Sequence, residues 1–232
     1  MSEMYQSPES NLVHDVESEA IEEVKNPWLS IFYQPRKTIR YIAYTKAYYG
    51  VPILVILNGL FTNWEMLWDS SYMEYGIVGQ VAIWFVLGSL YSLIGLFLFA
   101  YCMKLMAGLF GGRASFKAGC SALAWSYAVW IPFVPIFIWL IASIGIGEPI
   151  DMEDFESLEV LFGLAPGAIL LSGAAFIIVI IGSIFLYCHT FAEINGFTSA
   201  WKSLLIMLIT LIIVMALFVA IVFVVFSYGL AD

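Results

Sequence analysis

Charged residues are scarce in this sequence. Asp, Glu, Lys and Arg together make up 12% of its 232 residues, whereas soluble domains carry about 25%. Hydrophobic residues instead make up 62%, and the mean hydropathy is +0.93. This composition excludes an ordinary soluble domain and predicts an integral membrane protein.

Residues that commonly bind metals or perform catalysis are also few. The histidines are His14 and His189, and the odd number of cysteines, Cys102, Cys120 and Cys188, argues against a disulfide framework. The sequence contains no GxSxG, HExxH, P-loop or GxGxxG pattern. We therefore predict a protein that is not an enzyme and that has no metal or cofactor.

The nine Lys and Arg residues fall into three groups, separated by long apolar stretches. Lys and Arg beside membrane spans are retained on the cytoplasmic side. Five spans, with the N-terminus inside and the C-terminus outside, place every basic residue on that side. Basic residues so few and so close to the membrane also exclude nucleic-acid binding. The groups are Lys25, Arg36, Lys37, Arg40 and Lys46, then Lys104, Arg113 and Lys117, then Lys202.

The predicted fold is all-α, an integral membrane bundle of five transmembrane helices with a cytoplasmic interfacial amphipathic segment. A helix needs about 20 apolar residues to cross the hydrocarbon core. Pro132 and Pro135 fall within the third span and predict a helix kink. Gly88 and Ser92 permit close helix packing, and such small-residue faces would also allow a homo-oligomer. The membrane domain covers residues 47–232, with spans at about 47–64, 77–107, 119–146, 166–192 and 199–228.

Two segments precede the membrane domain. Residues 1–25 are acidic and poor in large apolar side chains, so we predict a disordered cytoplasmic tail that recruits another membrane or cytoplasmic protein. Residues 26–46 combine aromatic and aliphatic side chains with basic ones, which predicts an interfacial helix in contact with the lipid bilayer. The candidate lipid or partner contacts are Trp28, Arg36, Lys37, Arg40, Lys46, Arg113 and Lys117.

Ionisable groups in the spans are candidates for function, because burying them in lipid is costly. Four lie near the cytoplasmic ends of spans, namely Lys104, His189, Glu193 and Lys202. His189 and Glu193 are one helical turn apart, but two ligands are too few for a metal site. We instead predict a polar cluster in which Glu193 pairs with Lys104 or Lys202.

Several short motifs occur in a recognisable order. They are Asn-Pro-Trp-Leu-Ser-Ile at 26–31, Pro-Arg-Lys-Thr-Ile-Arg at 35–40, Gly-Gly-Arg-Ala-Ser-Phe at 111–116, Ala-Trp-Ser at 124–126 with Pro132, and Glu-Ile-Asn-Gly-Phe at 193–197. With these motifs in this order, the chain resembles prokaryotic members of the Yip family. Members of this family are five-span proteins named for interaction with Rab-type GTPases. The resemblance implies a cytoplasmic N-terminus and a C-terminus on the far side. The Asp-Leu-x-Gly-Pro element of eukaryotic members is absent, so their trafficking role is not carried over.

These observations predict a multi-pass membrane scaffold or adaptor that acts through a partner or lipid at the cytoplasmic leaflet. The alternative is a small transporter or channel for an apolar or lipid-like substrate. In that alternative the helix break at Pro132 and Pro135 lines the path, because broken helices form the sites of many transporters. The resemblance to prokaryotic proteins predicts a bacterial cytoplasmic membrane as the location.

Overall fold

The computed structural model describes residues 21–67, 69–144 and 166–229. Most of the predicted tail at 1–25 therefore lies outside the described residues. Within them every regular element is a helix, as the composition predicts. Four helices are long and apolar enough to cross a membrane, namely Gly76–Leu109, Phe116–Ala142, Leu170–Ile194 and Ala200–Phe223. The chain is an all-helical, multi-pass integral membrane protein.

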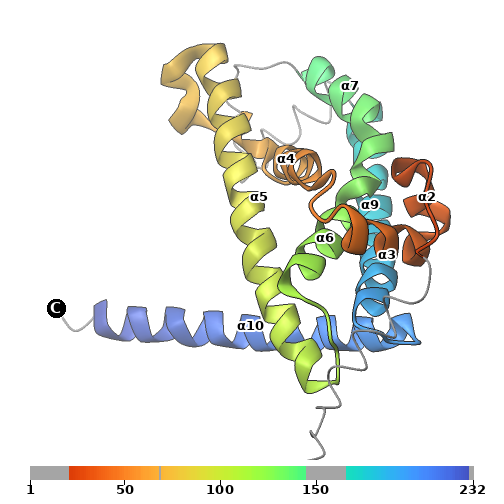
Figure 1. Cartoon of the computed structure of the whole chain (residues 1–232). Coiled ribbons are helices and arrows are strands. Elements are labelled where there is room, and N and C mark those ends of the chain that lie inside the picture. The colour runs from red at the N-terminus through yellow and green to blue at the C-terminus, as the bar shows by residue number, and fades with distance from the viewer. Residues whose placement is uncertain (1–20, 68, 145–165, 230–232) are drawn as a thin grey trace, which may run out of the picture.

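The centre of the bundle is a membrane segment that packs against two long helices. This segment begins with α6 (Phe116–Ser126), which contacts both α5 (Gly76–Leu109) and α9 (Pro166–Ile194) (Figure 1). Trp125 of α6 and Phe191 of α9 are among the largest fully buried side chains. The core therefore lies between α5 and α9, with α6 at its centre.

The central segment changes helix type in its middle. After α6 the chain forms a 3-10 helix, η3 (Tyr127–Phe133), and then α7 (Val134–Ile144). Pro132 lies inside η3, and Pro135 lies in the first turn of α7. Proline lacks a backbone donor and clashes with the preceding turn, and tight 3-10 turns mark strained stretches of helix. The change therefore falls where the two prolines predict a break.

The first predicted span, at 47–64, forms a shorter helix than expected. Gly50 adopts a left-handed conformation with φ of +72°, so α4 begins only at Val51 and covers Val51–Thr62. Its 12 residues extend about 18 Å, short of the roughly 30 Å of hydrocarbon. Two 3-10 helices, η1 (Trp64–Leu67) and η2 (Ser70–Tyr75), continue the chain to α5. The count of five spans therefore stays a prediction.

Hydrogen bonds tie α4 to its neighbours. The Asn58 Nδ2 donates to Ser92 Oγ on α5 at 3.0 Å, and Asn58 Oδ1 accepts from Trp130 Nε1 on η3 at 3.2 Å. Interhelical hydrogen bonds inside membranes contribute about 0.6 kcal/mol each on average. One asparagine thus links three helical elements in the interior of the bundle.

The predicted interfacial segment forms two short helices that pack on the bundle beside α9 (Figure 1). The first, α2 (Pro27–Tyr33), is capped by the side chain of Asn26. The second, α3 (Pro35–Thr45), contacts α9 and α6, and its Ile39 and Ile42 are fully buried. Both helices are therefore integral to the folded core rather than loosely attached to it.

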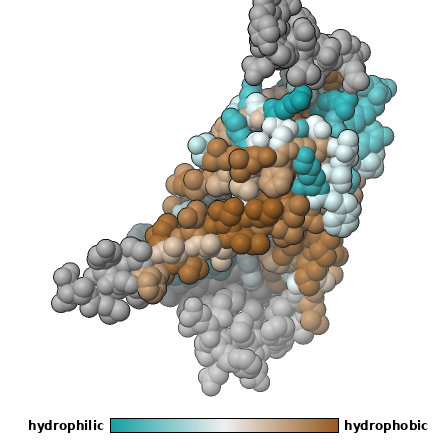
Figure 2. Space-filling view, turned by 90° about the horizontal axis from the view of Figure 1, so that it is seen from below, coloured by the Kyte–Doolittle hydropathy of each residue, from teal (hydrophilic) through white to brown (hydrophobic). Residues whose placement is uncertain are grey.

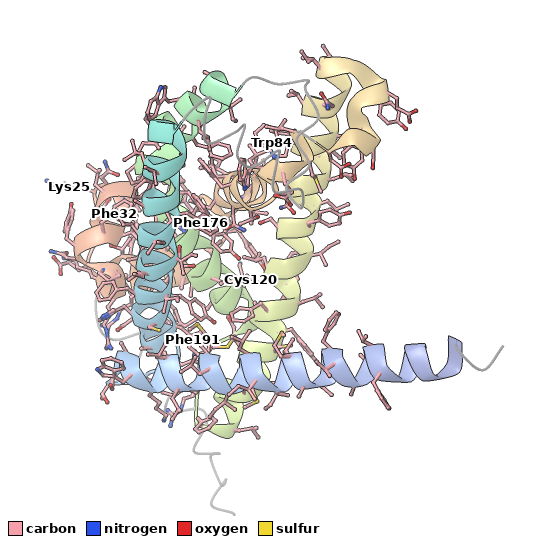
Figure 3. All side chains as sticks on the ribbon, turned by 180° about the vertical axis from the view of Figure 1, so that it is seen from behind. Lys25, Phe32, Trp84, Cys120, Phe176 and Phe191 are labelled. Atoms are coloured by element: carbon pink, nitrogen blue, oxygen red, sulfur yellow. The ribbon has the colours of Figure 1, made fainter. Side chains whose placement is uncertain are left out.

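The last helix, α10 (Ala200–Gly229), runs crosswise to α5 and α9 at one end of the bundle (Figures 1 and 3). Its buried side chains, Ser203, Ile206 and Thr210, lie in its first half, where it packs against α9 and α5. All side chains at 211–223 are exposed. Figure 2 shows α10 as an apolar band across this face. A helix that is apolar on all sides is suited to contact with lipid.

Candidate functional site at the basic end of the bundle

The predicted basic groups meet at one end of the bundle. Here α3 contacts the turn between α9 and α10, and that turn contacts the one between α5 and α6. We call the region formed by residues 34–46, 110–117 and 193–202 the basic end. In Figure 2 the hydrophilic side chains lie at the right-hand edge of the view. This is the side on which Figure 1 places α2 and α3.

Glu193, in the last turn of α9, is the centre of the basic end. Its Oε1 lies 2.5 Å from both Nε and Nη2 of Arg40, and its Oε2 lies 3.9 Å from Nη1 of Arg36. The Glu193 side chain is only 10% exposed. A poorly solvated charge requires a charged or hydrogen-bonded partner. The two arginines therefore hold α3 on the end of α9.

Arg36 also binds the backbone that follows α9. Its Nη1 donates to the carbonyl oxygen of Phe197 at 3.4 Å, and its Nη2 donates to that of Thr198 at 3.0 Å. The C-terminus of a helix has unpaired carbonyls and a partial negative charge, so a cation is stabilised there. A single guanidinium thus joins α3 to the turn between α9 and α10.

Asn195 holds the turn between α5 and α6. Its Oδ1 accepts a hydrogen bond from the Ala114 amide at 3.3 Å, and its Nδ2 donates to the Phe191 carbonyl at 2.9 Å. Gly112 permits this approach, because a Cβ there would lie 2.5 Å from Asn195 Oδ1. The Gly-Gly-Arg-Ala and Glu-Ile-Asn-Gly motifs, distant in the sequence, therefore form one contact.

An aromatic cluster joins α2, α6 and the start of α4. Trp28 Nε1 donates to Tyr49 Oη at 3.1 Å, Trp125 Nε1 donates to the Tyr49 carbonyl at 3.0 Å, and the Trp28 and Trp125 ring centroids are 4.8 Å apart. A Cβ on Gly50 would lie 3.0 Å from Trp28. Trp28, predicted as a lipid contact, is thus engaged in packing within the protein.

The short motifs of the sequence therefore gather in the basic end and in the aromatic cluster beside it. A comparison with family models matches the Yip1 domain over residues 29–221. The chain belongs to the Yip family. No curated protein and no solved structure matches the chain. The matched Yip1 domain includes the whole of the basic end.

The predicted pairing of Glu193 with Lys104 or Lys202 is corrected by the structure. The salt bridges described for Glu193 in this Yip1 domain are with the arginines of α3. Lys202 Nζ instead donates to the Phe110 carbonyl at 2.8 Å and lies 4.2 Å from the Phe197 ring centroid. The arginines of α3 are far from Glu193 in the sequence and reach it only because α3 folds back onto α9.

The other two members of the predicted polar cluster lie in different surroundings. The His189 ring packs against Phe185, with ring centroids 4.5 Å apart. Lys104 is exposed on α5. No hydrogen bond or salt bridge among the four predicted residues is described in this part of the chain.

The remaining candidate contact residues of the Yip1 domain have exposed or half-exposed side chains. Lys46, Arg113 and Lys117 are exposed. Lys37 forms a salt bridge with Glu22, just outside the matched domain. The basic end therefore contains arginines that bind Glu193 and exposed cations, Lys46, Arg113 and Lys117, for which no carboxylate partner is described in this part of the chain.

The Yip1 domain also contains an apolar cavity that the sequence analysis missed. Its volume is about 280 Å³, and the Phe61 and Trp130 rings stack in its wall with centroids 4.5 Å apart. Aromatic residues at roughly helical spacing in the third span were its only signal in the sequence. The cavity is lined by Phe61, Trp64, Trp130, Phe133, Ile136, Phe137, Leu140, Ser172, Gly173, Ala175 and Phe176.

Proposed function

We propose that this Yip1 domain is a non-enzymatic membrane scaffold whose basic end binds anionic lipid headgroups or a partner protein at the cytoplasmic leaflet. The observation that carries the proposal is the division between its basic side chains. Arg36 and Arg40 bind Glu193, whereas no carboxylate partner is described for the exposed side chains of Lys46, Arg113 and Lys117. The first set holds the surface together, and the second set is available for phosphate or carboxylate groups.

Exposed aromatic side chains on α2 and α3 support an interfacial position. Tyr33 and Tyr44 are both exposed, and Leu29 is exposed on α2. Tyrosine has an apolar ring and a polar hydroxyl, so it is suited to the boundary between lipid and water. The same helices bury Ile39 and Ile42 against the bundle. Their exposed aromatic residues can therefore contact lipid while the helices stay fixed.

We also propose five crossings with a cytoplasmic N-terminus in a bacterial cytoplasmic membrane, the fifth of which requires α10 to turn out of its crosswise position. The Tyr48 amide lies 3.5 Å from Ser121 Oγ in α6, and the Trp64 ring centroid lies 6.3 Å from that of Phe137 in α7. Together, α4 and η1 therefore follow the central segment from its first half to its second. This supports a first crossing that α4 alone is too short to make.

The lipid arm of the proposal is tested by replacing Lys46, Arg113 and Lys117 together with Gln in the full chain. Lipids that co-purify from nanodiscs of anionic and zwitterionic phospholipid are then quantified by mass spectrometry. Each basic residue near an anionic membrane contributes about 1 kcal/mol, so the enrichment of anionic lipid should fall about fivefold per charge. Unchanged enrichment in a folded variant would contradict the lipid arm.

Lys202→Gln is the matched control for this experiment. It removes one positive charge from the same end of the bundle, but from an ammonium group that binds the Phe110 carbonyl and lies over the Phe197 ring. We expect it to change the enrichment of anionic lipid less than Lys46→Gln does, because Lys46 is exposed. An equal effect of the two changes would mean that net charge alone determines the enrichment.

The partner arm is tested by affinity purification in mild detergent. The full chain is compared with a chain that lacks residues 1–25, and co-purifying proteins are identified by mass spectrometry. We expect a partner that is retained by the full chain and lost with the tail. The same set of proteins with both chains would show that the tail does not recruit a partner.

Transport of an apolar substrate is the second candidate function, because the cavity lies beside the helix break. Phe133 and Ile136 in the cavity wall each adjoin one of the two prolines. Transfer of a fluorescent phospholipid between liposome leaflets that is lost in Pro132→Ala and Pro135→Ala variants would favour this function. Equal transfer in protein-free liposomes would exclude it for that substrate.

A further inference from the structure

We propose that the cavity binds the acyl chain of a membrane lipid, with the ester carbonyl of that lipid accepting a hydrogen bond from Ser172. This inference goes beyond the scaffold function, and it rests on that proposal only for the placement of the basic end at a headgroup boundary. The residues that line the cavity belong to α4, η1, η3, α7 and α9 and include no residue of the basic end.

The cavity walls are almost entirely hydrocarbon. Phe61 stacks on Trp130 with an interplanar angle of 4°, and the Phe137 ring centroid lies 4.5 Å from that of Phe61. The indole N–H of Trp130 is already bonded to Asn58. The volume of about 280 Å³ is just below the roughly 300–1,000 Å³ that is typical of small-molecule pockets. It suits one hydrocarbon chain better than a whole lipid.

Ser172 lines the cavity, and rotation of its side chain would turn its hydroxyl into that space. Its Oγ is buried and has no hydrogen-bond partner in the described part of the chain. Other helical hydroxyls, those of Ser89 and Thr210, donate to the carbonyl four residues earlier at 2.6 and 2.7 Å. A buried polar group without a partner costs free energy. A ligand oxygen beside Ser172 would remove that cost.

The depth of Ser172 in the membrane indicates which oxygen this is. Ser172 precedes Glu193 by 21 residues of α9, about 31 Å along a helix. The hydrocarbon core is about 30 Å thick. With Glu193 at one headgroup boundary, Ser172 lies near the other, which is where the ester groups of phospholipids join their acyl chains.

The cavity also borders the surface that faces lipid. Phe176 lines the cavity and contacts Trp130, with ring centroids 5.8 Å apart, yet it is 45% exposed. Figure 3 shows Phe176 between α9 and α4. An acyl chain in the bilayer can therefore enter from the side without crossing the protein.

Lipid tails are as apolar as the cavity walls, so the transfer of a chain from bilayer to cavity gains little from the hydrophobic effect. Preference for the cavity must come from close packing on the aromatic rings and from the hydrogen bond with Ser172. The test therefore compares the cavity with other lipid-facing surface of the same protein. The exposed residues Phe85, Val86 and Leu90 of α5, which do not line the cavity, serve as that reference.

The full chain is placed in nanodiscs that contain a phosphatidylethanolamine with a diazirine in one acyl chain. After irradiation, labelled residues are identified by peptide mass spectrometry. We expect residues of the cavity wall to be labelled more strongly than Phe85, Val86 and Leu90 of α5. Labelling no stronger than at this reference surface would overturn the proposal.

Gly173→Leu is the variant that fills the cavity. A Cβ on Gly173 meets no atom within 4 Å, so a larger side chain can enter the space. Gly95→Leu is the matched control, because a Cβ on Gly95 of α5 also meets no atom within 4 Å and Gly95 does not line the cavity. The excess labelling should disappear in Gly173→Leu and persist in Gly95→Leu. Excess labelling that persists in a folded Gly173→Leu protein would overturn the proposal.

Ser172→Ala tests the hydrogen bond without filling the cavity. If Gly173→Leu does not fold, this variant still tests whether the lipid binds in the cavity. The excess labelling should fall about threefold, the size expected for one hydrogen bond inside a membrane. An unchanged excess in this variant would overturn the assigned role of Ser172.

Discussion

Gly59 of α4 and Gly88 of α5 face each other with no room for a side chain between them. A Cβ on Gly59 would lie 2.2 Å from the Gly88 carbonyl oxygen, and a Cβ on Gly88 would lie 2.9 Å from the Gly59 carbonyl oxygen. Helices in membranes associate through such close contacts, because lipid offers no hydrophobic force to drive them together. This contact keeps the short helix α4 within the bundle.

Gly59→Ala should therefore destabilise the protein by about 1–3 kcal/mol, the usual cost of overpacking. The added methyl group would collide with backbone, which cannot move aside as a flexible side chain can. Gly95→Ala on α5 is the control, and it should be neutral or slightly stabilising, because alanine favours helix. Reversible unfolding in mixed micelles measures both. Equal stability of the two variants would contradict the contact.

Glu193→Gln should destabilise the protein by about 1–2 kcal/mol, less than the 3–5 kcal/mol of a fully buried ion pair. The Arg40 side chain is 50% exposed, so solvent screens part of the interaction. Unfolding of the variant at low and high salt measures the loss. A wild-type midpoint at both salt concentrations would argue against a structural role for the pair.

Exchange of charges identifies the partner of Glu193. The double variant Glu193→Arg with Arg40→Glu should recover part of the stability that either single change removes. The double variant Glu193→Lys with Lys104→Glu should recover none, because the structure describes no contact between these two residues. Recovery only in the second pair would reverse the assignment.

Asn58→Leu should destabilise the protein by about 1 kcal/mol, because two interhelical hydrogen bonds of modest strength are lost. A double-mutant cycle with Ser92→Ala measures the coupling between α4 and α5. Thr62→Val is the control, since the Thr62 hydroxyl donates to the Asn58 carbonyl of its own helix. No coupling energy between Asn58 and Ser92 would show that their hydrogen bond does not stabilise the bundle.

Gly50→Ala should destabilise the protein by about 1–2 kcal/mol, the cost of a left-handed conformation for a residue with a Cβ. The Gly50 φ of +72° requires that conformation, and a Cβ would also crowd Trp28 and Trp125. Gly108→Ala is the control, because a Cβ there meets no atom within 4 Å. Tryptophan fluorescence should shift in the first variant only. Matching spectra and stabilities would mean that this turn tolerates side chains.

The sequence predicts the class of this protein well, because hydropathy and charge can be read along the chain without knowledge of contacts. The apolar stretches at 77–107, 166–192 and 199–228 coincide with α5, α9 and α10 to within a few residues. The stretch at 47–64 does not yield a helix of that length. Hydropathy measures how apolar a segment is, but it does not predict that the left-handed conformation of Gly50 makes α4 begin only at Val51.

The candidate site was harder to predict, because its contacts join residues far apart in the chain. Arg40 and Glu193 are separated by 153 positions, and no local pattern identifies either as the partner of the other. From the sequence, Asn195 is typical of a turn after α9. Its side chain also accepts a hydrogen bond from the Ala114 amide, in the turn between α5 and α6. Asn58 is an amide side chain within an apolar helix, and this was the sequence signal for the hydrogen bonds that join α4 to α5 and η3.

By itself the sequence determined an all-helical membrane protein of the Yip family with its cations next to the spans. Composition and the order of motifs are properties of the chain that do not depend on how its helices pack. Only the tertiary structure decided which cations bind Glu193, which are exposed, and that aromatic side chains enclose a cavity beside the proline break. These features depend on distances between separate helices. Such distances arise only when the helices pack.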